Sequence, residues 1–152
     1  MKRIALFLCV AFSAINFTSD LSAQTICENG FAGEYACDGY DLYTYFPLSS
    51  VGGGDNGNDC WGWVDSESGR EFVLFGRSDG MSVVEITDPL APSFIANLPT
   101  ATYPSLWRDI KVIGDYAFIG SEAGMHGMQI LDLTQVLDLS GFPFNITATS
   151  NY

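Results

Sequence analysis

The single histidine of this chain is the residue best suited to acid–base chemistry, and it lies in the loop sequence Gly-Met-His-Gly at residues 124–127. A histidine that acts as a general base needs a partner within hydrogen-bond reach to orient its ring. The repeat described below predicts three carboxylates near His126, those of Asp109, Asp115 and Glu122. None of them has a diagnostic spacing. A loop histidine that bonds to neighbouring backbone is therefore the simpler interpretation.

Arg108 and Asp109 directly precede an apolar segment and complete the candidate catalytic set. With His126 they would serve a secreted hydrolase or lyase. Two other roles for Arg108 stay open. It could form an ion pair with Asp109 or with Asp65 of the adjacent unit, or it could bind an anion together with Lys111. One histidine cannot supply a histidine-based metal site by itself.

The sequence Asp-Asn-Gly-Asn-Asp at residues 55–59 is rich in oxygen ligands. Calcium takes six to eight oxygens from carboxylates, amides and carbonyls. Asp55, Asn58 and Asp59 are therefore the candidate metal ligands, and calcium is the one cofactor that the sequence suggests. The twelfth position of an EF-hand loop would be Ser66 instead of glutamate. This favours a flexible loop over a calcium site.

Other catalytic signatures are missing from the sequence. It has no Gly-x-Ser-x-Gly elbow, and its triple glycine at residues 52–54 is not followed by Gly-Lys-Ser/Thr. The formal net charge is −12. Nucleic-acid binding needs clustered Lys and Arg, so that class of partner is excluded. Such acidity is typical of the solvated surface of an exported protein. These observations favour a non-enzymatic role, with a protein or a glycan as partner.

The first 23 residues predict a secretory signal peptide. Lys2 and Arg3 precede an apolar run at residues 4–15, which is too short to span a bilayer, and Leu-Ser-Ala at 21–23 offers a cleavage site. Without this segment the chain holds 4 basic and 17 acidic residues. No later apolar run reaches the length of a transmembrane helix. We expect a secreted or cell-surface protein.

Three cysteines follow the signal segment. The oxidising compartment implied by export favours a disulfide between Cys27 and Cys37, which would close a small loop in a segment without its own core. Cys60 is left over. We expect it to be a buried free thiol that acts as a small apolar residue.

Two segments of the chain repeat one pattern. Residues 69–88 and 114–132 each run through a glycine turn, an apolar strand, a second glycine-containing turn and another apolar strand to an aspartate. A period of about 45 residues built from short strands is typical of propeller blades. The turn spacing and the Val, Ile, Phe and Tyr content predict an all-β protein. The expected strands are residues 61–64, 71–76, 82–87, 94–98, 109–113, 116–121 and 128–133, with a helical turn or connector at 134–139.

The segments WGWVD, SDGMSVVEITDP, WRDIKV and HGMQILDL occur in the same order as in a known family. With the opening CENGFAGEYACDGYDL, the chain resembles the bacterial choice-of-anchor B proteins, which are built from LVIVD-type β-propeller repeats. The resemblance covers about residues 27–139. It implies export, a propeller fold and one of several alternative surface anchors, and it implies no reaction.

The sequence therefore predicts a signal peptide at residues 1–23, a disulfide-stapled segment with a Gly-rich loop at 24–59, and two four-stranded blades of a partial β-propeller at 60–152. A propeller ring closes with about four to eight blades. We therefore expect an N-terminal fragment of a longer protein. The expected function is that of an exported binding module, with the secreted hydrolase or lyase as the alternative.

Overall fold

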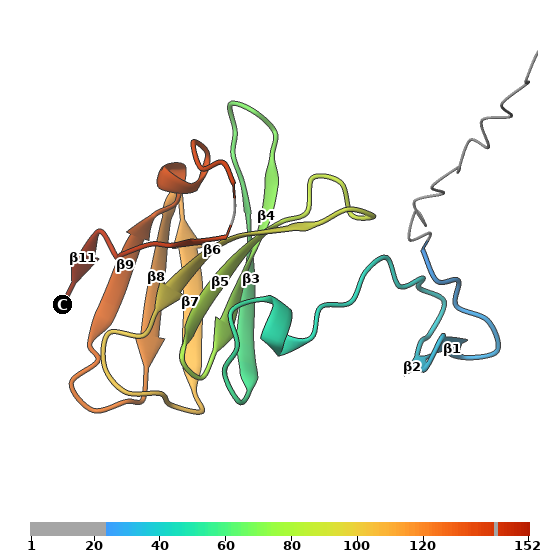
Figure 1. Ribbon diagram of the computed structural model, residues 1–152, viewed down its shortest axis with the longest axis horizontal. Helices are drawn as coiled ribbons and strands as arrows, with labels where there is room; N and C mark the ends of the chain where they lie inside the picture. The colour runs from blue at the N-terminus through green and yellow to red at the C-terminus, as the bar shows by residue number, and fades with distance from the viewer. Residues whose placement is uncertain (1–23, 142) are drawn as a thin grey trace, which may run out of the picture.

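The computed structural model describes residues 24–141 and 143–152, and the predicted signal peptide lies outside the described residues. The described chain is all-β, with two short 3-10 helices and three sheets (Figure 1). Its elements are β1 (Phe31–Ala32), β2 (Tyr35–Ala36), η1 (Leu48–Ser50), β3 (Gly57–Val64), β4 (Glu71–Arg77), β5 (Gly80–Glu85), β6 (Ser93–Pro99), β7 (Arg108–Ile113), β8 (Tyr116–Ser121), β9 (Met128–Asp132), η2 (Leu133–Val136), β10 (Phe144–Asn145) and β11 (Ser150–Asn151). Within these residues no helix is both long and apolar enough to cross a membrane.

Each copy of the sequence repeat forms one antiparallel meander. The first sheet has the strand order β10-β6-β5-β4-β3, and the second has the order β11-β9-β8-β7. The predicted glycine turns are in place, because Gly69 and Gly114 adopt the positive φ angles that glycine tolerates. The fourth strand of the second sheet is the short β11, and β10 crosses back to pair in parallel with β6. The all-β prediction is confirmed.

The two sheets enclose one hydrophobic core. Phe72 and Leu74 of the first sheet and Ala117 and Ile119 of the second belong to the same cluster of buried side chains. β3 lies beside β7, and the position of a Cβ on Gly76 would be 3.3 Å from the Cδ1 atom of Ile110. These contacts fix which face each sheet turns toward the other.

On β4 of the first sheet, the side chains that point into the core come from residues whose backbone groups form hydrogen bonds with the preceding strand, β3. The amide of Ile86 donates to the carbonyl of Glu71, so Glu71 directs its backbone groups toward β5. Backbone direction and side-chain face alternate together along a strand. Phe72, one residue on, therefore bonds toward β3 and points its ring into the core.

In the second sheet, the opposite face is buried. The amide of Leu133 donates to the carbonyl of Asp115, so Ala117, two residues on, bonds toward the following strand β9. Ala117 nevertheless points into the core. The sheets thus pack head to tail, through opposite faces of the repeated unit. The core residues keep the same spacing from the glycine turns at Gly69 and Gly114, so it is the direction of backbone hydrogen bonding that differs by one residue between the two repeats.

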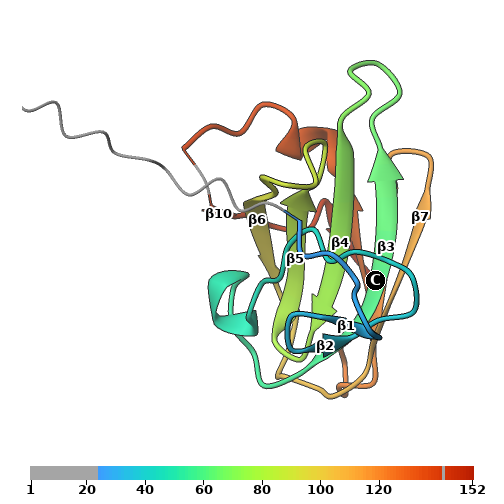
Figure 2. The ribbon, with the colours of Figure 1, turned by 90° about the vertical axis from the view of Figure 1, so that its right-hand side faces the viewer.

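The outer face of the first sheet is covered by the segment at residues 43–54. Figure 2 shows η1 and the N-terminal hairpin on this side of β3, β4 and β5. A cavity of about 330 Å³ remains between the segment and the sheet, and its lining is almost entirely apolar. The Gly-rich loop is shorter than predicted, because η1 and the first residues of β3 take up parts of residues 48–59.

The N-terminal hairpin of β1 and β2 holds the Cys27–Cys37 disulfide, which confirms that prediction. In Figure 1 this hairpin stands apart from the sheets. The threonine hydroxyl of Thr44 donates to the carbonyl of Pro89 at 3.2 Å and ties the following segment to the first sheet. The prediction for Cys60 is wrong: its thiol is free but exposed, because it lies on the face of β3 opposite to the buried Trp63.

Candidate functional site

Arg108 is the central residue of a buried polar cluster between the two sheets. Its side chain starts at the first residue of β7, on the core face, and only 4% of the residue is exposed. Its Nε donates to the carbonyl of Arg77 in the first sheet at 3.1 Å, and its Nη2 donates to the hydroxyl of Thr100 at 2.8 Å. Burial lowers the pKa of the Arg108 guanidinium, and the nearby carboxylate of Asp79 opposes this effect. Arg108 therefore connects the sheets through hydrogen bonds.

His126 lies beside Arg108 and is 3% exposed. Its Nε2 is 3.0 Å from Nη1 of Arg108, and its Nδ1 is 3.1 Å from the carbonyl oxygen of Gly127. A guanidinium only donates hydrogen bonds, so Nε2 must accept and Nδ1 must carry the proton. The ring is therefore neutral, and the lone pair on Nε2 already accepts the hydrogen bond from Arg108.

None of the three carboxylates that were candidates to orient His126 forms a described hydrogen bond with it, and two of them bond elsewhere. Asp109 accepts a hydrogen bond from Nζ of Lys111 at 2.7 Å, and Asp115 accepts one from the indole of Trp63 at 3.3 Å. The structure brings together Arg108 and His126, and it places Asp109 on the opposite side of β7. The expected ion pair of Arg108 with Asp109 or Asp65 is not formed, because Arg108 points into the core; Asp65 bonds to Ser68.

Lys111 does not join Arg108 in an anion site. Its ammonium group lies between Asp109 and Asp59, at 2.7 and 3.7 Å, and 4.6 Å from the centre of the Trp61 ring. The bond with Lys111 lowers the pKa of Asp109, and the same bond raises the pKa of Lys111. The lysine charge is thus already balanced by carboxylates.

The candidate calcium ligands also have structural partners. Asp59 accepts a hydrogen bond from the amide of Ile110 at 2.8 Å, which joins β3 to β7. Asn58 donates to the carbonyl of Leu106 at 3.0 Å, and the backbone amide of Asp55 donates to the hydroxyl of Ser78. Among the described residues, no three His, Cys, Asp or Glu side chains gather closely enough to hold a metal ion.

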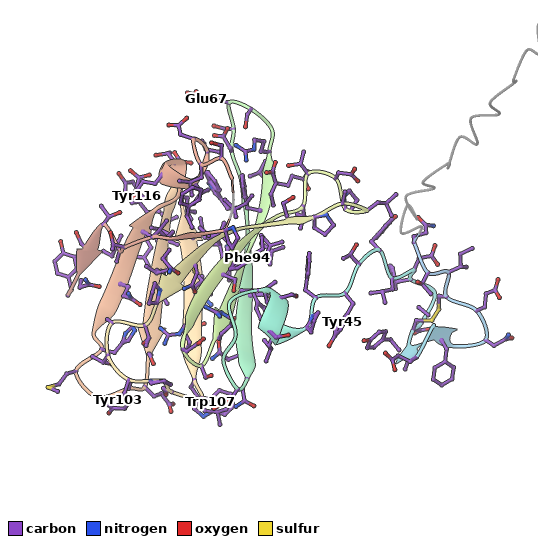
Figure 3. The ribbon with its side chains drawn as sticks, in the orientation of Figure 1. Tyr45, Glu67, Phe94, Tyr103, Trp107 and Tyr116 are labelled. Carbon is purple, nitrogen blue, oxygen red and sulfur yellow. A yellow bond between two sulfur atoms is a disulfide. The ribbon has the colours of Figure 1, made fainter. Side chains whose placement is uncertain are left out.

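A groove of about 440 Å³ opens next to the buried cluster. Trp107 contributes an exposed indole, and the remaining lining is polar or small; the groove is lined by Asp59, Trp107, Arg108, Asp109, Gly120, Ser121 and Glu122. Figure 3 shows Trp107 and Tyr103 at the same end of the molecule, with Glu67 at the other end. The groove therefore combines an aromatic face with hydroxyl and carboxylate groups.

Sequence reasoning missed two of these residues. Arg77 is 1% exposed, and its guanidinium bonds to Asn97 and lies 3.4 Å from Asp79. It reads in sequence as the exposed end of a strand. Trp107 reads as an ordinary apolar residue before a strand, yet 59% of it is exposed. The signal available in the sequence was the pair Trp107-Arg108 directly before a strand.

A scan of the chain against protein-family models and searches of curated proteins and of solved structures found no match.

Proposed function

We propose that this chain is a non-enzymatic binding module of an exported protein, built from propeller-type repeats. The observation that carries the proposal is the head-to-tail packing of two equivalent four-stranded meanders. Successive blades of a propeller pack in this way, since each blade turns one face to its predecessor and the other to its successor. The resemblance to choice-of-anchor B proteins supports the same architecture.

The candidate catalytic groups already have hydrogen-bond partners within the protein, which supports binding over catalysis. A general base must have a lone pair free to take a proton from substrate. The Nε2 lone pair of His126 accepts from Arg108, and the carboxylate of Asp109 bonds to Lys111. Both groups therefore stabilise the fold in this arrangement. The Cys27–Cys37 disulfide supports an oxidising compartment and so supports export.

The groove beside Trp107 is the proposed binding site, and a glycan is the proposed ligand class. An exposed indole can stack on the apolar face of a sugar ring. The hydroxyl of Ser121 and the carboxylates of Asp109 and Glu122 can bond to sugar hydroxyls.

The test compares glycan binding by the native chain and two tryptophan variants. Trp107→Ala removes the indole of the groove, whereas Trp61→Ala removes an exposed indole that lies outside it. We expect glycan-array binding, followed by calorimetry on the best glycan, to weaken at least tenfold for Trp107→Ala only. Equal effects of both variants, or an array without any binding, would overturn the proposal.

A further inference from the structure

We propose that the contact between Arg108 and His126 is an acid-sensitive latch, which holds the two sheets together at neutral pH and opens when the imidazole takes up a proton. The latch spans three parts of the fold. Arg108 starts β7, His126 lies in the loop between β8 and β9, and the carbonyl of Arg77 ends β4 in the first sheet.

The geometry allows only one protonation state of the ring. The Nη1 group of Arg108 donates to Nε2 of His126 at 3.0 Å, and the carbonyl oxygen of Gly127 accepts a hydrogen bond from Nδ1–H. An imidazolium has a proton on both nitrogens and accepts no hydrogen bond. Protonation therefore replaces an attractive contact with two cations that face each other at the same distance.

Burial makes this replacement costly. His126 and Arg108 are 3% and 4% exposed, so water cannot screen their charges. A buried charge without a partner is strongly unfavourable. We expect the ring to become protonated only when Arg108 moves away, which also breaks its bond to the carbonyl of Arg77.

The surrounding charges do not offer the protonated ring a partner. From the first sheet, Arg77 repels Arg108 and Asp79 attracts it, and the Asp79 carboxylate is paired with Arg77 at 3.4 Å. On β7 itself, Asp109 is paired with Lys111. Three further groups face this region: Glu122 on the histidine loop, Asp59 on β3, and the hydroxyl of Tyr103, which accepts from the amide of Gly124. The described hydrogen bonds connect none of these groups to His126.

The sign of the effect follows from proton linkage. In the unfolded chain a histidine takes up a proton near pH 6.5. The folded chain cannot do so while the latch is closed, so the unfolded state binds more protons below that pH. Stability is therefore complete at neutral pH and falls on acidification, with the unfolding constant rising by up to about tenfold per pH unit.

The experiment compares urea unfolding of the full chain and of His126→Gln at pH 7.5, 6.5 and 5.5. The glutamine amide oxygen can accept from Arg108 but does not titrate. We expect the unfolding constant of the native chain, relative to the variant, to rise about fivefold between pH 6.5 and 5.5. The same pH dependence in both proteins, or no pH dependence in the native chain, overturns the latch.

A second measurement keeps the test decisive if His126→Gln does not fold. Nitrogen-15 NMR of the native imidazole distinguishes the protonated from the bare ring nitrogen. We expect the Nδ1–H form at pH 7.5, and on acidification the imidazolium should appear together with changed amide signals at the Arg77–Arg108 contact. A ring that takes up its proton near pH 6.5 without any change at that contact overturns the proposal.

Discussion

The indole nitrogen of Trp63 in the first sheet lies 3.3 Å from a carboxylate oxygen of Asp115, in the turn between β7 and β8 of the second sheet. The same indole stacks on Phe72, with ring centres 5.1 Å apart, and the residue is almost fully buried. One side chain thus supplies core packing and a hydrogen bond between the two repeats. This relationship places Trp63 among the residues on which the stacking of the sheets depends.

Trp63→Ala should destabilise the protein by about 3–5 kcal/mol, because it opens a large cavity in the core. Urea unfolding monitored by circular dichroism measures the change. The matched control is Trp61→Ala on the same strand, whose ring is 39% exposed and contacts Lys111. Its loss should cost about 0.5–1 kcal/mol. Similar losses for the two variants would mean that Trp63 does not pack between the sheets.

Gly76→Ala tests how closely β4 approaches β3 and, through Ile110, the second sheet. An added Cβ would meet the side chain of Asn58, the carbonyl of Asp59 and the Cδ1 atom of Ile110. Overpacking of this kind costs about 1–3 kcal/mol. Gly62→Ala on the neighbouring strand is the control, because its Cβ would meet nothing within 4 Å. We expect thermal unfolding to shift downward for Gly76→Ala alone, and an unchanged melting temperature there would contradict the packing.

The ion pair between Arg70 and Glu85 should contribute to stability only above acidic pH. Arg70 donates two hydrogen bonds to the carboxylate of Glu85, at 2.9 and 2.8 Å. These bonds lower the pKa of Glu85. A carboxylate whose folded pKa lies below its unfolded value of about 4.3 contributes stability above that value and loses it as the pH falls through the folded pKa.

For this partly exposed pair we expect Glu85→Gln to lose about 0.5–1 kcal/mol at pH 7. At about pH 3 the difference from the native chain should be smaller, because the Glu85 carboxylate becomes protonated as the pH falls through its folded pKa. Urea midpoints at the two pH values measure it, with Glu71→Gln as an exposed control on β4. A difference that persists unchanged at pH 3 would assign the effect to packing instead of charge.

The Cys27–Cys37 disulfide should stabilise its own hairpin and leave the sheets unaffected. It closes a loop with a sequence separation of 10, for which the chain-entropy model gives about 2–3 kcal/mol. Replacing both cysteines by serine should speed limited proteolysis at residues 28–36 and leave the melting temperature of the sheets unchanged. A lower melting temperature would show that the hairpin packs on the sheets.

The repeat made the strands of the two meanders predictable from sequence. Its glycine turns and apolar runs predict β4, β5, β8 and β9 to within two residues at each end. Local rules suffice here, because turn residues and alternation act over a few positions. The strand β10 was not predictable, since its pairing with β6 depends on a segment distant in sequence.

The roles of the polar residues were less accessible from sequence. Arg108 and His126 were candidates, and their mutual contact depends on which side chains of β7 face inward, where Arg108 is buried and Asp109 is exposed. The oxygen-rich segment at residues 55–59 suggested calcium, but its side chains join β3 to the second sheet. Only the packing of the sheets shows whether such a side chain is free to bind a metal or forms a hydrogen bond within the fold.

The most direct test of the head-to-tail packing is a nuclear Overhauser measurement on protein with labelled isoleucine methyl groups. The account predicts a strong cross-peak between the Cδ1 methyl of Ile110 and the α protons of Gly76, on the face of the first sheet that carries Phe72 and Leu74. Cross-peaks from this methyl to Val73 and Val84, which lie on the opposite face of the first sheet, would contradict it.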